Sequence, residues 1–136
     1  MTRTTMDNLS RAMHGEAFAY AKYMLFAERA RQSGNTELAE LLEKTAREEL
    51  WAHFAEEAKL AGLVHDDADN LKDAIQGESY QVETMYREFA EQAGAAGDQA
   101  AADRFAEIRH DEIRHREAFK EALAKLATTS TAIREY

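Results

Sequence analysis

The 136-residue sequence contains no cysteine and no proline, and only six glycines. The lack of cysteine excludes a disulfide framework, a thiolate zinc site and an iron–sulfur centre within these residues. No apolar run approaches the roughly 20 residues that cross a membrane, and the first ten residues lack the apolar core of a signal peptide. We therefore expect a soluble, cytoplasmic protein with no membrane partner.

Charge and composition further limit the possible partners and the fold class of the protein. The formal net charge is −9, and no basic face is apparent, which argues against nucleic acid as a partner. Alanine, glutamate, leucine and arginine are abundant, which favours helix. A chain of this length forms one domain with its own core, so residues 1–136 are predicted to be a single all-α domain.

Apolar residues recur at helical spacing in four segments. We expect a turn at Ser33–Thr36, with Gly34 ending one helix and Thr36 capping the next, and a second turn at Gly94–Asp98. A polar linker is expected at His65–Asp69, and a frayed tail after Thr128. The predicted helices are Asp7–Gln32, a second one from the first turn to Ala61, Asn70–Ala93, and Gln99–Ala127.

The two halves of the chain repeat one another. Asn8–Glu16 matches Asn70–Glu78 at an offset of 62 residues, whereas Phe26–Glu28 matches Phe89–Glu91 at an offset of 63. The halves are therefore two versions of one helical hairpin, and the third helix carries one extra residue after Glu78. A helix absorbs such a residue as a π-bulge, and these bulges often mark functional sites.

Each predicted helix places one glutamate on its apolar stripe. In the last helix, for example, Glu112 and His115 continue the stripe of Phe105 and Ile108. The stripes of the second and third helices include Leu38 and Phe89. In each hairpin the glutamates lie 18 or 19 residues before the turn glycine and 15 after it, so both stand at the same height. The four glutamates are Glu16, Glu49, Glu78 and Glu112.

Four uncompensated carboxylates in a core would cost more than the stability of a domain this size. Two divalent cations would cancel their charge. Protonated acids, pairing with arginine or lysine, or an incorrect helical register are the alternatives. Oxygen-rich ligation with imidazole suits iron or manganese, with zinc possible, and nearby tyrosines suit redox chemistry with peroxide or O₂. Tyr20, Tyr23, Tyr80 and Tyr86 are the tyrosines expected beside the ligands, and the alternative is that they only pack in the core with a hydrogen-bonded hydroxyl.

Gly15-Glu16, Glu49, Gly77-Glu78 and the motif Glu112-x-x-His115 together resemble the rubrerythrin branch of the ferritin-like superfamily. The resemblance extends over nearly the whole chain. It implies a ferritin-like four-helix bundle with two iron ions that reacts with hydrogen peroxide or O₂. It also implies that the four glutamates serve as bridging and terminal ligands, and that His115 is a terminal ligand.

Three features depart from the family pattern. The four-cysteine rubredoxin domain is absent, so an external protein is expected to donate electrons. The third helix of the family carries Gly-Glu-x-x-Glu, but here Gln81 occupies the position of the second glutamate. The second helix of the family carries Glu-x-x-His, but here Ala52 occupies the histidine position and His53 follows it. His53 can approach the metal that Glu49 binds, but from a different angle. The alternative is that His53 lies at the margin of the bundle, hydrogen-bonded to a neighbour or to water.

The sequence thus predicts a non-haem diiron oxidoreductase that reduces hydrogen peroxide or O₂. A ferroxidase or other iron-handling protein, and a metal-free helical interaction protein, are the alternatives. The residues expected to be catalytic are Glu16, Glu49, Glu78, Glu112 and His115. A homodimer is also expected. The linker between the hairpins, Gly62–Asp69, is too short to run back along the second helix, which favours exchange of hairpins between two chains.

Overall fold

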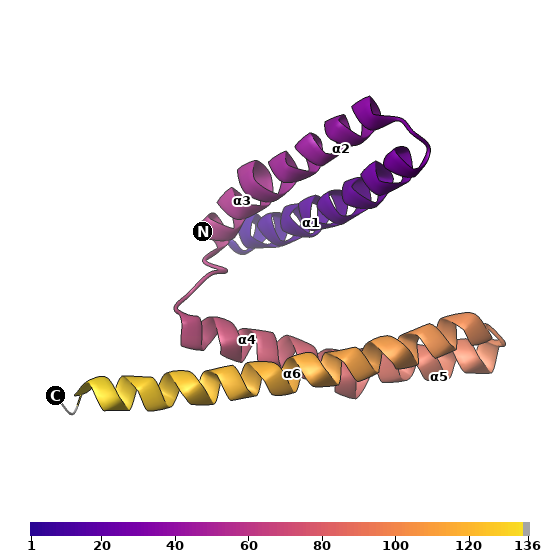
Figure 1. Cartoon of the computed structure of the whole chain (residues 1–136). Helices are drawn as coiled ribbons and strands as arrows, with labels where there is room; N and C mark the ends of the chain where they lie inside the picture. Colours follow the sequence, from indigo (N-terminus) through magenta and orange to yellow (C-terminus); the bar gives the residue numbers. More distant parts are fainter. Residues whose placement is uncertain (135–136) are drawn as a thin grey trace. The chain divides into compact units, whose positions relative to one another are not determined.

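The protein consists of two helical hairpins, which divide between Val64 and His65 (Figure 1). The computed structural model describes the backbone of residues 1–134 and the side chains of residues 1–128. No strand occurs in the described residues. The predicted all-α class, built from two homologous hairpins, is confirmed.

The first hairpin pairs α1 (Arg3–Gln32) with a second helical rod in three parts. This rod starts as α2 (Thr36–Glu48), widens into the π-helical turn η1 (Glu49–Phe54), and ends as α3 (Ala55–Ala61). The boundaries of both helices agree with the sequence prediction to within a few residues. The π-helical turn η1 was not predicted.

The second hairpin begins with a rod that is also interrupted by a π-helical turn. It comprises α4 (Asp67–Tyr80), η2 (Gln81–Met85) and α5 (Tyr86–Ala96), and it packs against α6 (Gln99–Arg134). The π-bulge predicted from the extra residue after Glu78 is therefore confirmed at η2.

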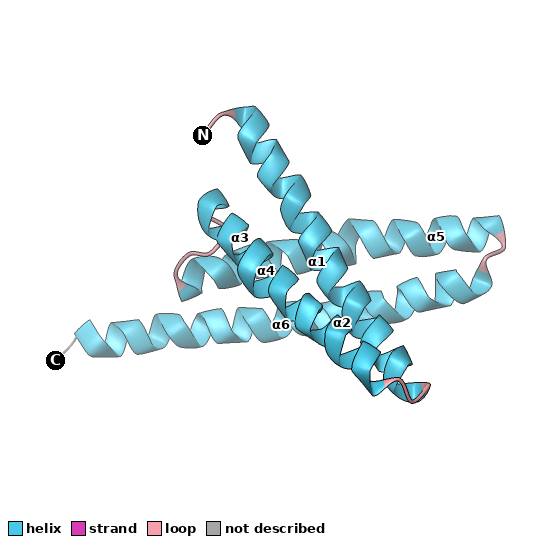
Figure 2. Ribbon diagram, turned by 90° about the horizontal axis from the view of Figure 1, so that it is seen from above, coloured by secondary structure: helices cyan, strands magenta, loops and turns pink. Residues whose placement is uncertain are grey.

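The turns within the hairpins are short, as the loop segments of Figure 2 show. Gly34 and Gly97 both have positive φ, 76° and 84°, a conformation that favours glycine. Asn35, rather than the predicted Thr36, caps α2, because its Oδ1 accepts a hydrogen bond from the Leu38 N–H at 3.2 Å. The predicted turn Gly94–Asp98 begins three residues too early, since Gly94–Ala96 remain helical until Gly97 ends α5.

Two further boundaries differ from prediction. The helix α6 continues to Arg134 instead of fraying after Thr128, since neither proline nor glycine interrupts it. The helix α4 starts at Asp67, because Asp66 Oδ1 accepts a hydrogen bond from the Asp69 N–H at 2.9 Å and caps the helix. The link between the hairpins is therefore Gly62–Asp66, five residues instead of the predicted eight.

Small residues form the buried contacts of each hairpin, because they let two helices approach closely. Within the first hairpin the buried side chains are all alanines; in the second they are Val82 and Ala102. Two residues of the predicted core stripes, Leu38 and Phe89, remain 43% and 40% exposed. Both line grooves in their hairpins, since a pair of helices covers only one flank of each stripe. The buried alanines are Ala27, Ala30, Ala39, Ala46 and Ala58.

A long-range hydrogen bond supports the π-helical turn of the second hairpin. Arg109 Nε on α6 donates to the backbone carbonyl of Val82 at 2.7 Å. A π-helical turn breaks the regular i→i−4 hydrogen-bond ladder, so its backbone groups need other partners. At an offset of 63, the counterpart of Arg109 in the first hairpin is Ala46, which is buried.

None of the described helices is both long enough and apolar enough to cross a membrane.

Candidate metal centre

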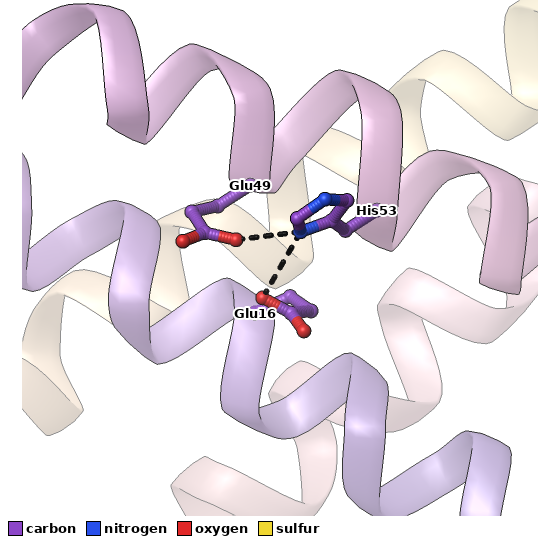
Figure 3. Close-up of side chains that lie close together, drawn as sticks. All are labelled: Glu16, Glu49 and His53. Carbon is purple, nitrogen blue, oxygen red and sulfur yellow. Dashed lines mark hydrogen bonds and ion pairs between the residues drawn. The ribbon is translucent and has the colours of Figure 1, made fainter.

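Three ligand-type side chains converge in the first hairpin (Figure 3). Glu16 projects from α1, and Glu49 and His53 project from η1. His53 Nδ1 lies 2.7 Å from Glu49 Oε2 and 3.7 Å from Glu16 Oε2. We call Glu16, Glu49 and His53 the first triad.

The second hairpin repeats this arrangement. His115 Nδ1 lies 2.7 Å from Glu112 Oε2 and 3.9 Å from Glu78 Oε1. Glu78 comes from α4, and Glu112 and His115 come from α6. We call Glu78, Glu112 and His115 the second triad.

The two triads also match in exposure. The histidine side chains are 51% and 53% exposed, and the glutamates that bond to them, Glu49 and Glu112, are 16% and 14% exposed. Within each triad, one ligand atom of every residue lies within 4.8 Å of the others. Two carboxylates and an imidazole at this spacing can hold one divalent cation, so each hairpin presents the ligands for one ion.

The pKa values of the first triad reflect how close its side chains lie. A hydrogen bond with Glu49, followed by burial and the Glu49 charge, raises the pKa of Glu16. The same hydrogen bond, together with one from His53, lowers the pKa of Glu49. The hydrogen bond to Glu49 in turn raises the pKa of His53. The three groups thus lie close enough to change one another's pKa values, and a cation bound among them would compete with protons for the same atoms.

The second triad contains a buried oxygen with no partner. Glu78 Oε2 is inaccessible to solvent and has no hydrogen bond. Burial is the largest cause of the raised pKa of Glu78, followed by the hydrogen bond and charge of Glu112. A buried carboxylate oxygen without a donor is costly, and a cation at this position would compensate it.

The structure brings all six candidate ligands together in two groups of three. Of the other residues expected nearby, Tyr20 and Tyr23 on α1, Gln81 at the start of η2, and Tyr86 are half-buried. Tyr80, which was also expected there, is 59% exposed. The ring of Tyr86 packs against Phe105, with centroids 6.1 Å apart. A role for these residues beside the candidate ligands stays a prediction.

The repeat contained a signal for the unexpected turn η1. Glu49 matches Glu112 at an offset of 63, but His53 matches His115 at an offset of 62. The second helix of the first hairpin therefore has one extra residue between glutamate and histidine. This is the same kind of change that correctly predicted η2 in the other hairpin.

Comparison with known proteins gives consistent matches. The sequence model of the rubrerythrin family matches residues 7–53 and again residues 50–123. Nigerythrin from Nitratidesulfovibrio vulgaris is 32% identical over 109 residues, covering 70% of this chain and 54% of nigerythrin. The protein named "Putative rubrerythrin" from Methanocaldococcus jannaschii is 30% identical over 145 residues, covering 91% of this chain and 71% of that protein. This chain thus spans about half the length of nigerythrin.

Solved structures of nigerythrin are also similar. The fully reduced, all-ferrous state is 29% identical and the mixed-valence state 30% identical. Each alignment covers 93% of this chain and 69% of the nigerythrin chain, with a TM-score of 0.47.

Proposed function

Because the chain belongs to the rubrerythrin family, and so to the ferritin-like helical class predicted from its sequence, we propose that it is a diiron oxidoreductase. Its substrate would be hydrogen peroxide or O₂. The observation that carries the proposal is the pair of matching Glu-Glu-His triads, one in each hairpin. One such group could arise from surface acids, but two with the same internal distances point to a shared use.

The donor set fits a pair of iron ions. Four carboxylates and two imidazoles are oxygen-rich ligands of the kind that iron and manganese prefer, and four negative charges balance two divalent cations. The unpartnered Glu78 Oε2 gives a structural reason for a cation at the second triad. Two bound iron ions would supply the two electrons needed to reduce an O–O bond.

The residues of each triad have separate roles in this proposal. Glu16 and Glu78 would each hold one ion as terminal carboxylates, and the histidines would be terminal ligands. Glu49 and Glu112 would bridge the two ions, which requires the two triads to face each other in a four-helix bundle. The sequence contains no cysteine, so the reducing electrons would come from outside these 136 residues.

Two partly exposed apolar residues support closure of the bundle. Leu38 and Phe89 lie on the predicted core stripes but are not covered within their own hairpins. Packing one hairpin against another would bury both and would exclude water from the carboxylates. Residues 1–136 would then form a single ferritin-like domain.

The link between hairpins favours a homodimer in which hairpins are exchanged. Its five residues, Gly62–Asp66, span at most about 18 Å. The rod from Thr36 to Ala61 is about 39 Å long, so the link cannot return along it as a ferritin-like crossover does. Exchange would give each metal pair one triad from each chain. Light scattering should report a dimer, and a monomer that binds two metal ions would overturn the exchange.

The reaction can be tested on protein loaded anaerobically with two Fe(II) per chain. We expect rapid oxidation on mixing with H₂O₂ or with O₂. With H₂O₂, one molecule should be consumed and two waters formed per two Fe(II) oxidised. Glu112→Ala should abolish the reaction, whereas Glu48→Ala, which removes an exposed acid next to Glu49, should leave it unchanged.

Three outcomes would contradict the proposal. Oxidation no faster than that of free Fe(II) with either oxidant would exclude the oxidoreductase. Uptake of many irons per chain would indicate iron storage through ferroxidase activity instead. Failure to bind any metal would favour a helical interaction protein.

A further inference from the structure

The two triads place their histidines at different sequence spacings. His53 follows Glu49 by four residues, whereas His115 follows Glu112 by three. In a regular α-helix, a residue four positions on lies about 40° to one side of the first, and a residue three positions on lies about 60° to the other side. The two imidazoles would then approach their glutamates from directions about 100° apart.

The structure contains no such difference. Both Nδ1 atoms lie 2.7 Å from their glutamates on the same helix, and 3.7 and 3.9 Å from the glutamates of the opposite helix. The two Nδ1 atoms therefore lie at matching distances from their carboxylates, although the sequence spacings differ.

The backbone between Glu49 and His53 explains the match. This segment is the π-helical turn η1, in which the N–H of Ala55 bonds to the carbonyl of Leu50, five residues earlier. The corresponding segment from Glu112 to His115 is regular α-helix. A π turn takes one more residue to complete than an α turn, so its fourth residue stands where the third would stand in an α-helix.

We propose that the π-helical turn η1 keeps His53 in register with Glu49. It absorbs the extra residue between Glu49 and His53, and so makes His53 the third ligand of an ion held by the first triad. This inference rests on the proposed metal centre and adds to it a role for a backbone conformation. Ala52, which occupies the position that an unbroken α-helix would turn toward the ion, would then not be at a ligand position.

The first test moves the imidazole without changing chain length. In the double variant Ala52→His/His53→Ala, η1 turns position 52 away from the carboxylates. We expect affinity for one of two ions to fall by about tenfold or more, with the second ion unaffected. The readout is Mn(II) and Co(II) binding by calorimetry, with the ion count confirmed by elemental analysis. His65→Ala, which removes an exposed histidine from the link, should bind both ions as the unmodified protein does.

The second test removes the extra residue. Deletion of Ala52 creates the spacing Glu-x-x-His found in the second hairpin, and it should convert η1 into α-helix without rotating the flanking segments. We expect both ions to bind with affinities within about threefold of the original. Helix content by circular dichroism should also be unchanged.

These outcomes separate the inference from the proposed function. If the unmodified chain binds no metal, the proposed function fails. If it binds two ions, and the double variant binds both with unchanged affinity, the register inference is wrong. Loss of an ion on deletion of Ala52, in a chain that retains its helix content, would also overturn it.

Discussion

The two hairpins reach matching Glu-Glu-His geometries through different backbones. The first has its π-helical turn in the second helix of the hairpin, between Glu49 and His53. The second has it in the first helix of the hairpin, where η2 begins at Gln81, three residues after Glu78. An extra residue in an α-helix would rotate everything beyond it by about 100°, whereas a π turn confines the disturbance to one turn. The comparison shows that ligand positions can be kept while the sequence spacing changes.

The surroundings of the two triads have diverged more than the triads. Where the second hairpin has Arg109, which donates to the Val82 carbonyl of η2, the first has the buried Ala46. At an offset of 62, Glu57 of the first hairpin corresponds to Phe119 of the second. Glu57 Oε2 is buried without a hydrogen bond, and the phenylalanine in the second hairpin avoids this polar cost at the corresponding position.

The largest expected effect comes from removing a proposed bridge. Glu49→Ala and Glu112→Ala should each reduce the metal content from two ions per chain to none, because in the proposed centre each of these glutamates would hold both ions. Metal analysis after loading with Fe(II) or Mn(II) and desalting measures this, with Glu48→Ala as the control. One ion retained in either variant would mean that the hairpins bind their ions independently.

Metal removal should have the next largest effect. An ion that binds only the folded chain adds about 2.7 kcal/mol at 100 times its dissociation constant. We therefore expect the melting temperature at neutral pH to rise by several degrees with Mn(II) relative to chelator. Equal melting temperatures would count against metal binding by either triad.

Arg109→Met should weaken the second hairpin selectively. Losing a charged donor leaves the Val82 carbonyl without its partner, at a cost of about 1–2 kcal/mol. Urea denaturation measures the loss. Arg104→Met is the control, because Arg104 is exposed and pairs with Glu107 of its own helix. The first triad should keep its metal affinity, and a loss there would show that the hairpins are coupled.

Glu57→Leu should make the first hairpin resemble the second. Replacing a buried carboxylate oxygen that lacks a partner by an apolar group should stabilise the chelated protein by about 1 kcal/mol. Metal content should stay at two ions per chain. A loss of metal would instead identify Glu57 as an additional ligand.

The smallest expected effect is a pH dependence of the stability of the metal-free protein. The raised pKa values of Glu16 and Glu78 give stability that is complete below 4.5 and is lost as pH rises through the folded-state values. His53 adds a similar loss above 6.5. The lowered pKa of Glu49 acts oppositely, but only as pH falls below 4.5.

The melting temperature in chelator should therefore decline between about pH 5 and pH 8. Glu16→Gln and Glu78→Gln should each reduce that slope. An increase in stability across this range would show that the carboxylates do not share protons in the folded chain.

Much of the architecture could be predicted from local sequence. Apolar spacing located all four helices, and the change of repeat offset from 62 to 63 located η2. The glutamates could be identified because an acid on an apolar stripe stands out in any α-helical register. The errors at Thr36 and Gly94 arose where neighbouring residues compete for one cap, which hydrogen-bond geometry decides.

The sequence by itself therefore determined which residues are candidate ligands and which helices carry them. Only the tertiary structure decided how His53 meets Glu49 and Glu16. The direction in which a side chain leaves a helix can be calculated from the sequence only if the number of residues per turn is known. With the α-helical value, His53 would not lie where its counterpart His115 lies in the second hairpin. The π-helical turn changes that value over a single turn, and contacts with the opposing helix, which local sequence does not contain, fix where the imidazole lies.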